Sequence, residues 1–113
     1  MTDQPDIFHP DIRKLERIMI NNVKKQNFQY VYLLSSLKSG KWYIGCTNNL
    51  RKRLNEHNIG KAGYTKGRGP FNFIYFEGCI NKLDAFAREK YLKSGMGRRY
   101  LKNRLKRFLL LTL

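Results

Sequence analysis

Acidic residues are scarce in this chain of 113 residues: 8 Asp and Glu stand against 23 Lys and Arg, which gives a formal net charge of +15. A folded domain with this excess repels itself unless an anionic partner offsets the charge. The basic residues recur along the whole chain instead of forming one amphipathic membrane anchor. The composition therefore favours nucleic acid over an anionic membrane as the partner.

Cysteines and long apolar runs are also few. The two cysteines, Cys46 and Cys79, follow expected strands and lack metal-ligand spacing, so they are predicted to be reduced, small hydrophobic residues. The longest apolar run, Phe108 to Leu111, is far too short to cross a bilayer. The first residues lack a basic segment followed by an apolar one. We therefore expect a cytoplasmic protein (organellar or nuclear in a eukaryote) that is not secreted and has no membrane partner.

Several common catalytic motifs are missing. The glycines of GKAGYTKGRG precede a strand instead of a helix and lack the G-K-[ST] ending of a nucleotide-binding loop. No Ser-His-Asp or Cys-His arrangement is suggested by spacing. A two-metal phosphodiesterase would lack carboxylate ligands.

The length fits one domain, and 42% hydrophobic and 13% aromatic residues are enough for a core. We expect residues 1–27 to form an N-terminal extension, with a disordered start and an amphipathic helix over Asp11–Lys25 that has Asp11 as its N-cap. Residues 28–110 then form the main domain. The helix could cover the sheet, bind a protein partner or mediate self-association.

The pattern of the main domain alternates between strands and helices. Its order predicts an α+β fold with a three-stranded sheet flanked by helices and preceded by the extra helix. A helix begins near Asn49, capped by Thr47 or Asn48, and ends at Gly60. The remaining elements are strands at Phe28–Ser35, Lys41–Cys46 and Phe71–Gly78, and helices at Asn81–Lys93 and Arg98–Leu109, the last two separated by a break at Ser94–Gly97.

Polar residues on the hairpin and the following helix form one candidate site. Pairing the hairpin about the middle of its turn places Tyr32 opposite Tyr43, where the two phenols either serve one site or simply pack. Arg53 and His57 are four residues apart and share the helix face that borders the sheet. Alternatively, Arg53 only covers apolar surface and His57 is an ordinary helix-end residue.

Glu89 is the candidate metal ligand. It lies between apolar residues of its helix, and a hard divalent cation facing DNA needs at least one carboxylate. The alternative is an ion pair with Lys93, one helical turn further on. With Glu89 as ligand, the metal and Arg53 could stabilise charge while a tyrosinate or a histidine-assisted tyrosine activates water. Arg53, a metal ion and the positive net charge would each favour the phenolate.

The segments Tyr30-Val31-Tyr32, Tyr43-Ile44-Gly45 and Asn49–Leu54, followed by His57, together resemble the signature of the GIY-YIG nuclease superfamily, and most closely its small stand-alone members. The resemblance implies a three-stranded antiparallel sheet and cleavage of DNA that depends on a single Mg²⁺ or Mn²⁺ ion. Relatives include the excision-repair incision subunit, intron homing endonucleases and some restriction enzymes. Branched or damaged DNA is therefore a possible substrate.

The resemblance also implies roles for individual residues. Tyr32 corresponds to the tyrosine that activates water, His57 to a histidine that can assist it and Arg53 to the arginine that stabilises the phosphate. Tyr43 corresponds to the second-motif tyrosine, and Glu89 to the metal-binding glutamate.

Two departures from the family pattern stand out. Tyr30 replaces the glycine of the first motif. Asn103 is the single candidate for a late asparagine of the site, although its expected helix face points away from the apolar stripe.

Other basic residues are candidates for contacts with nucleic acid. The leading hypothesis is a DNA endonuclease, and the alternative is a non-catalytic DNA- or RNA-binding module with the same fold, since phosphate contacts need neither tyrosine nor glutamate. The candidate contact residues are Arg51, Lys52, Lys61, Lys66, Arg68, Arg98, Arg99 and Lys102.

Overall fold

The architecture follows from one strand that is apolar on both faces. The structure, a computed structural model, describes residues 11–25, 28–60 and 63–111. Its elements are α1 (Ile12–Lys25), β1 (Gln29–Ser36), β2 (Trp42–Thr47), α2 (Leu50–Asn58), the short 3-10 helix η1 (Gly63–Thr65), β3 (Phe71–Cys79), α3 (Lys82–Lys93), α4 (Gly95–Arg104) and α5 (Lys106–Leu111).

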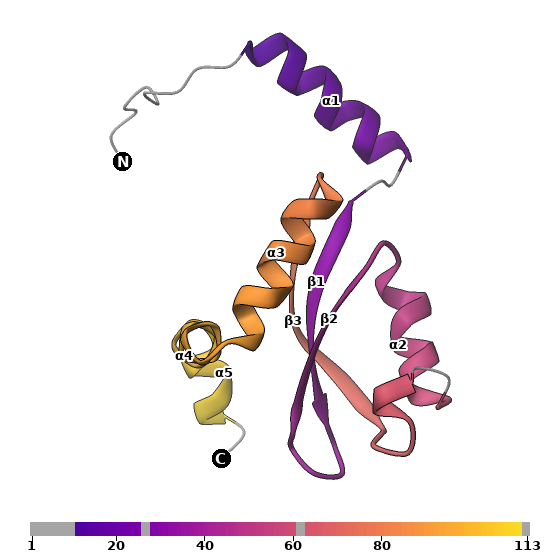
Figure 1. Cartoon of the computed structure of the whole chain (residues 1–113), viewed down its shortest axis with the longest axis vertical. Coiled ribbons are helices and arrows are strands. Elements are labelled where there is room, and N and C mark those ends of the chain that lie inside the picture. The colour runs from indigo at the N-terminus through magenta and orange to yellow at the C-terminus, as the bar shows by residue number, and fades with distance from the viewer. Residues whose placement is uncertain (1–10, 26–27, 61–62, 112–113) are drawn as a thin grey trace.

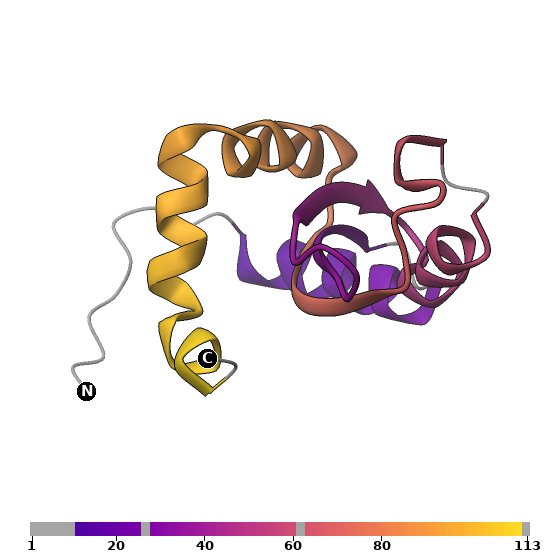
Figure 2. The same ribbon diagram turned by 90° about the horizontal axis from the view of Figure 1, so that it is seen from below.

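The sheet has the strand order β2-β1-β3, and β1 pairs antiparallel with both neighbours. The predicted α+β class with a three-stranded antiparallel sheet is therefore confirmed. The hairpin strands begin and end one residue later than the sequence pattern predicts. In β1 the side chains of Val31 and Leu33 pack against α3 and α4, while Tyr32 and Leu34 lie on the opposite face, beside α2. Figures 1 and 2 show α2 and α3 on opposite sides of the sheet.

The predicted pairing of the hairpin was wrong by two residues. Tyr32 lies opposite Gly45, and Tyr43 lies opposite Leu34. Because side chains alternate between faces with a period of two, a shift of two residues keeps Tyr32 and Tyr43 on the same face. They are diagonal neighbours instead of direct partners.

Two predicted helix starts also need correction. Asn49, instead of Thr47 or Asn48, caps α2, because its side chain accepts a hydrogen bond from the Lys52 N–H at 3.1 Å. The helix α3 ends at Lys93 as predicted, but the predicted break at Ser94–Gly97 is limited to Ser94, which caps α4, and that helix already begins at Gly95. A Cβ at Gly97 would lie 2.7 Å from the carbonyl carbon of Tyr91, so glycine allows α4 to start this close to α3. The predicted final helix is two helices, α4 and α5, separated at Leu105.

The helix α1 stands apart from the sheet (Figure 1). The Arg13 N–H donates to the Asp11 carboxylate at 3.0 Å, as expected of an N-cap. Among the apolar side chains of α1 that the structure describes, Ile12 is 61% and Leu15 is 41% exposed. Binding of a partner protein or a second copy through this face stays a prediction, and the expected disorder of residues 1–10 lies outside the described residues. None of the described helices is long and apolar enough to cross a membrane.

An ion pair fastens α3 and α4 to the sheet. Arg88 on α3 donates to both carboxylate oxygens of Glu77 on β3, at 2.9 and 3.0 Å. The guanidinium lies 4.7 Å from the ring centroid of Tyr100 on α4. The Tyr75 hydroxyl also donates to Glu77, at 3.1 Å, and burial together with the Glu77 charge raises the pKa of Tyr75 to about 12, so this hydroxyl keeps its proton. Three elements therefore meet at one carboxylate.

We expect Arg88→Ala to lower the free energy of unfolding by about 1–3 kcal/mol, because it leaves the half-buried Glu77 carboxylate without its cationic partner. Lys90→Ala, an exposed change on the same helix, should cost no more than about 0.5 kcal/mol. Urea denaturation followed by circular dichroism measures both. Equal losses in the two variants would contradict this role of Arg88.

Candidate active site

The position of the Tyr32 phenol depends on the glycine opposite it. Tyr32 is 3% exposed, and its ring crosses the neighbouring strand at Gly45. A Cβ at Gly45 would lie 2.7 Å from Tyr32 Cζ, closer than any side chain allows. Gly45 therefore provides the space through which the phenol reaches the outer edge of β2.

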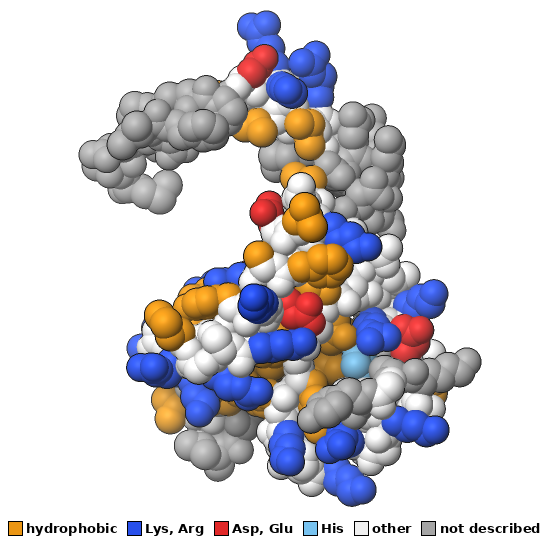
Figure 3. All heavy atoms as spheres, viewed as in Figure 1, with side chains coloured by type: hydrophobic (Ala, Val, Ile, Leu, Met, Phe, Trp, Pro, Cys, Tyr) orange, Lys and Arg blue, Asp and Glu red, His pale blue; other side chains and the backbone are white. Residues whose placement is uncertain are grey.

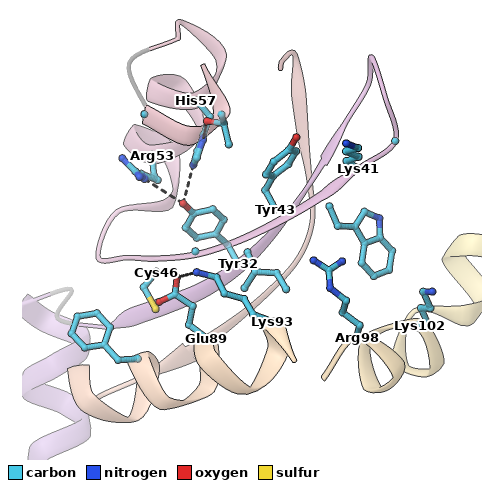
Figure 4. A pocket seen from close by; sticks show the side chains of 17 residues that line it. Tyr32, Lys41, Tyr43, Cys46, Arg53, His57, Glu89, Lys93, Arg98 and Lys102 are labelled. Atoms are coloured by element: carbon cyan, nitrogen blue, oxygen red, sulfur yellow. Dashed lines mark hydrogen bonds and ion pairs between the residues drawn. The ribbon is translucent and has the colours of Figure 1, made fainter. Parts of the chain in front are cut away.

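The helix α2 supplies both hydrogen-bonding partners of this phenol. Arg53 Nε–H donates to the Tyr32 hydroxyl oxygen at 3.2 Å, and His57 Nε2 lies 2.8 Å from the same oxygen (Figure 4). Because Arg53 can only donate, the hydroxyl proton is available for His57 Nε2, which then accepts. Arg53 also forms a 3.4 Å ion pair with Glu56.

Thr65 is a contact that the sequence pattern did not reveal. Its Oγ1 forms a short hydrogen bond with His57 Nδ1, and the residue is buried in η1. With Nε2 accepting from Tyr32, Nδ1 carries the ring proton and donates to Thr65. Thr65 lies within GKAGYTKGRG, a segment notable in the sequence for its glycines and basic residues. A polar residue in that loop gives no local signal that it turns back toward His57.

Burial controls the protonation of the Tyr32–His57 pair. It raises the pKa of Tyr32 above its ordinary value of 10.0, and the hydrogen bond and charge of Arg53 only partly oppose this. Burial, with the charge of Arg53, also lowers the pKa of His57 below its ordinary 6.5. The expected effect of Arg53 on the phenol has the predicted direction but is outweighed by burial. At neutral pH the pair consists of a neutral phenol and a neutral imidazole.

A cavity of about 1100 Å³ runs along β2. The strand is at the edge of the sheet, and seven consecutive residues, Gly40–Cys46, line the cavity. Successive strand residues point to opposite faces, so the cavity connects the α2 side with the α3 side. This explains how Tyr32, on one face, and Glu89, reached from the other, share one space (Figure 4). Tyr43 lines the same cavity and packs edge-on against Phe71.

Glu89 is the carboxylate that the cavity offers to a cation. Its Oε2 accepts from Lys93 Nζ at 3.0 Å, so the ion pair considered from the sequence is present as well. Burial, then the neighbouring Glu89, raises the pKa of the Cys46 thiol to about 12, which leaves it protonated at neutral pH. Within the described residues no three His, Cys, Asp or Glu side chains gather around a metal position. The site therefore fits a hard divalent cation held by Glu89, with water and phosphate oxygens completing its shell.

The structure divides the remaining candidates. Arg98 and Lys102 line the cavity, whereas Asn103 is exposed on α4 and lies outside the lining. Lys61 lies outside the described residues. Figure 3 shows Lys and Arg side chains spread over this face of the molecule, with few acidic ones among them. The candidates that are exposed and outside the lining are Arg51, Lys52, Lys66, Arg68 and Arg99.

Comparison with known proteins identifies the family of the chain. The sequence pattern of the GIY-YIG catalytic domain matches residues 28–107, which is most of the chain. The chain belongs to the GIY-YIG family. Proteins with this domain are nucleases as a class and generally use divalent metal ions, with DNA as the substrate.

The relatives of this GIY-YIG domain include small bacterial proteins. A UPF0213 protein of Clostridium perfringens is 51% identical over 65 residues, which cover 57% of this chain and 69% of the relative. A UPF0213 protein of Oceanobacillus iheyensis is 46% identical over 65 residues, 57% of this chain and 74% of the relative. A solution NMR structure of a UPF0213 protein from Bacillus halodurans is 33% identical, covers 67% of this chain and 83% of its own, and has a TM-score of 0.43.

We expect Gly45→Ala to displace the Tyr32 ring and break its hydrogen bonds to His57 and Arg53, with a loss of about 1–3 kcal/mol in the free energy of unfolding. Gly63→Ala is the matched control, because Gly63 also lines the cavity but a Cβ there meets no atom within 4 Å. Urea denaturation gives the stabilities. A Gly45→Ala protein as stable as Gly63→Ala would contradict the close approach.

Proposed function

We propose that this protein is an endonuclease that hydrolyses DNA phosphodiester bonds with one Mg²⁺ or Mn²⁺ ion and a tyrosine-activated water. One observation carries the proposal: the Tyr32 hydroxyl, in a cavity with a carboxylate, bonds to both a histidine and an arginine. A module that only binds DNA has no use for a buried phenol–imidazole pair or for an acid in a surface that attracts phosphate. The family membership supports the same reaction class.

Tyr32 and His57 would act together as the base. The raised pKa of Tyr32 makes a standing phenolate a minor species, so the phenol needs an acceptor for its own proton. His57 Nε2 is 2.8 Å away and neutral. As the Tyr32 oxygen takes a proton from the attacking water, its original proton moves to Nε2, and Thr65 holds the resulting imidazolium at Nδ1.

Arg53 and Glu89 would serve the phosphate. The contacts of Arg53 with Tyr32 and Glu56 use its Nε and Nη1, and among the described residues no partner is recorded for Nη2, which can therefore donate to a phosphate oxygen. Glu89 would hold the divalent cation, which as a Lewis acid would supply charge stabilisation at the phosphate. Lys93, paired with Glu89, is the cation that the metal would have to displace. Tyr43 would orient the substrate within the same cavity.

We expect Glu89→Gln and Tyr32→Phe each to reduce cleavage of DNA by at least about 100-fold in Mg²⁺ or Mn²⁺. Branched, nicked, flapped and plain duplex substrates are incubated with each protein, and products are resolved on denaturing gels. DNA affinity, measured by fluorescence anisotropy without divalent cation, should stay within a few fold of wild type.

Two variants control for the chemistry of the substitutions. Tyr30→Phe removes a hydroxyl from the same strand outside the cavity lining, and Asp84→Asn removes a carboxylate from the exposed start of α3. Both should cleave like wild type. If wild type cleaves none of the substrates, or if Glu89→Gln cleaves as fast as wild type, the proposed reaction is wrong and the non-catalytic binding module becomes the better description.

The pH dependence of the cleavage rate should reveal the protonation of His57. Protonation of His57 removes the acceptor for the Tyr32 proton, so cleavage falls as pH decreases through the pKa of His57. Burial places that pKa below 6.5, so the midpoint of this fall should lie below pH 6.5. His57→Gln should be slow and lose this acidic limb. Single-turnover rates measure both, and a wild-type midpoint above 6.5 would contradict the assigned role.

A further inference from the structure

The cavity extends well beyond the residues assigned to chemistry. Its volume of about 1100 Å³ exceeds what a single phosphate needs and lies at the upper end of small-molecule sites. Beyond Tyr43, the lining continues with Lys41, Arg98 and Lys102 (Figure 4), and it also includes Trp42. This group of four residues, the distal subsite, has no role in the proposed hydrolysis.

The distal subsite lies within reach of the same DNA strand. Trp42 is three residues before Gly45 on β2, which at about 3.3 Å per strand residue is a separation of roughly 10 Å. Successive phosphates of one strand advance about 3.4 Å along a DNA helix. A strand with one phosphate at Tyr32 therefore places a nucleotide about three steps further along the same strand at Trp42.

The chemistry of the distal subsite suits a nucleotide. Arg98 and Lys102 are one turn apart on α4, so both reach the cavity from the same side of the helix. Within the described part of the chain no carboxylate pairs with either of them, and Glu89 is the acidic residue of the lining, already bound to Lys93. Lys41 lies directly before Trp42, at the start of β2, and lines the same cavity. These cations are available for phosphates.

Trp42 is the feature that a purely phosphate-binding surface would not need. It is the single tryptophan of the chain. Part of it packs on the core cluster that contains Val31, Leu33 and Leu101, which holds it in place, and part of it lines the cavity. A fixed aromatic side chain beside basic residues is how proteins stack unpaired bases. A base inside a duplex already has neighbours on both faces and must leave the stack before it can reach an aromatic ring.

We propose that the distal subsite binds an unpaired nucleotide about three steps from the cleaved phosphate on the same strand, with Trp42 stacking on its base and Arg98 and Lys102 binding its phosphates. The inference rests on the proposed function and narrows its substrate class. The favoured DNA has a single-stranded segment beside the cleavage position, such as a flap or an overhang, and a fully paired duplex lacks the base that Trp42 requires.

Fluorescence tests this without any variant, because all tryptophan emission comes from Trp42. The full-length protein is titrated, in EDTA and therefore without cleavage, with a blunt duplex and with the same duplex carrying an unpaired tail. We expect the tailed DNA to quench Trp42 and to bind about tenfold more tightly, and the blunt duplex to bind without quenching. Equal quenching and equal affinity for the two DNAs would overturn the inference.

Substitutions separate stacking from charge. Trp42→Leu should weaken binding of tailed DNA about tenfold and leave duplex binding unchanged, while Trp42→Phe keeps most of the preference. Because Trp42 also touches the core, circular dichroism checks that each variant is folded. The double change Arg98→Gln with Lys102→Gln should reduce the slope of log affinity against log salt for tailed DNA by about 1.4. Arg104→Gln, on the opposite side of α4 and outside the lining, should leave the slope unchanged.

These measurements test the distal subsite separately from the proposed hydrolysis. Selective quenching by tailed DNA in a protein that cleaves nothing would refute the hydrolysis and support the distal subsite. Cleavage of both DNAs at equal rates, without quenching and without an effect of Trp42→Leu, would support the hydrolysis and overturn the distal subsite.

Discussion

The close contact between the Tyr32 phenol and the backbone of Gly45 is the constraint on which the site depends. The phenol starts on the central strand, where burial is greatest, and reaches the edge of the sheet because the residue opposite has no side chain. In that position the Tyr32 hydroxyl oxygen forms hydrogen bonds with Arg53 and His57 of α2. The edge strand then separates the α2 side from the α3 side by one backbone, so a carboxylate on α3 comes within electrostatic range of the phenol. Because Gly45 has no Cβ, side chains from β1, α2 and α3 can meet in one site.

Burial of the Tyr32 phenol also determines which groups of the site carry protons. In a chain of net charge +15, a surface tyrosine would be expected to lose its proton more easily, yet burial of Tyr32 works in the opposite direction and prevails. Burial lowers the pKa of His57 as well, so the two shifts keep the proton on the phenol and the acceptor on the imidazole. The excess charge thus acts over the surface of the protein, where it attracts DNA, and has little control over the proton inside the site.

The sequence predicted the elements and the shared helix face of Arg53 and His57 because these depend on local spacing. The grouping of Tyr32 with them spans more than twenty residues and followed from the resemblance to the GIY-YIG signature. It missed the hairpin register, since the shift of two residues depends on the turn and leaves the apolar pattern of both strands unchanged. It misread Gly95 and Gly97 as helix breakers because the Ser94 cap and the close approach to Tyr91 are properties of the α3–α4 packing. Thr65 and Trp42 were missed because neither carries a charge, and the turn of the loop that brings Thr65 to His57, eight residues before it, has no periodic pattern.

The basic cavity along the edge strand β2 also disfavours pairing of that edge with a second copy of the chain. The outer side of β2 has no strand partner in the sheet, and exposed edges of this kind tend to pair with a second copy. Here Lys41, Lys93, Arg98 and Lys102 line the space beside that edge. A second β2 would bring the same four cations against them, and like charges at close range disfavour the pairing. A polyanion meets no such repulsion. The charges that make the edge accessible to DNA therefore also protect it from another copy of the chain, and replacing them with neutral residues would weaken both properties together.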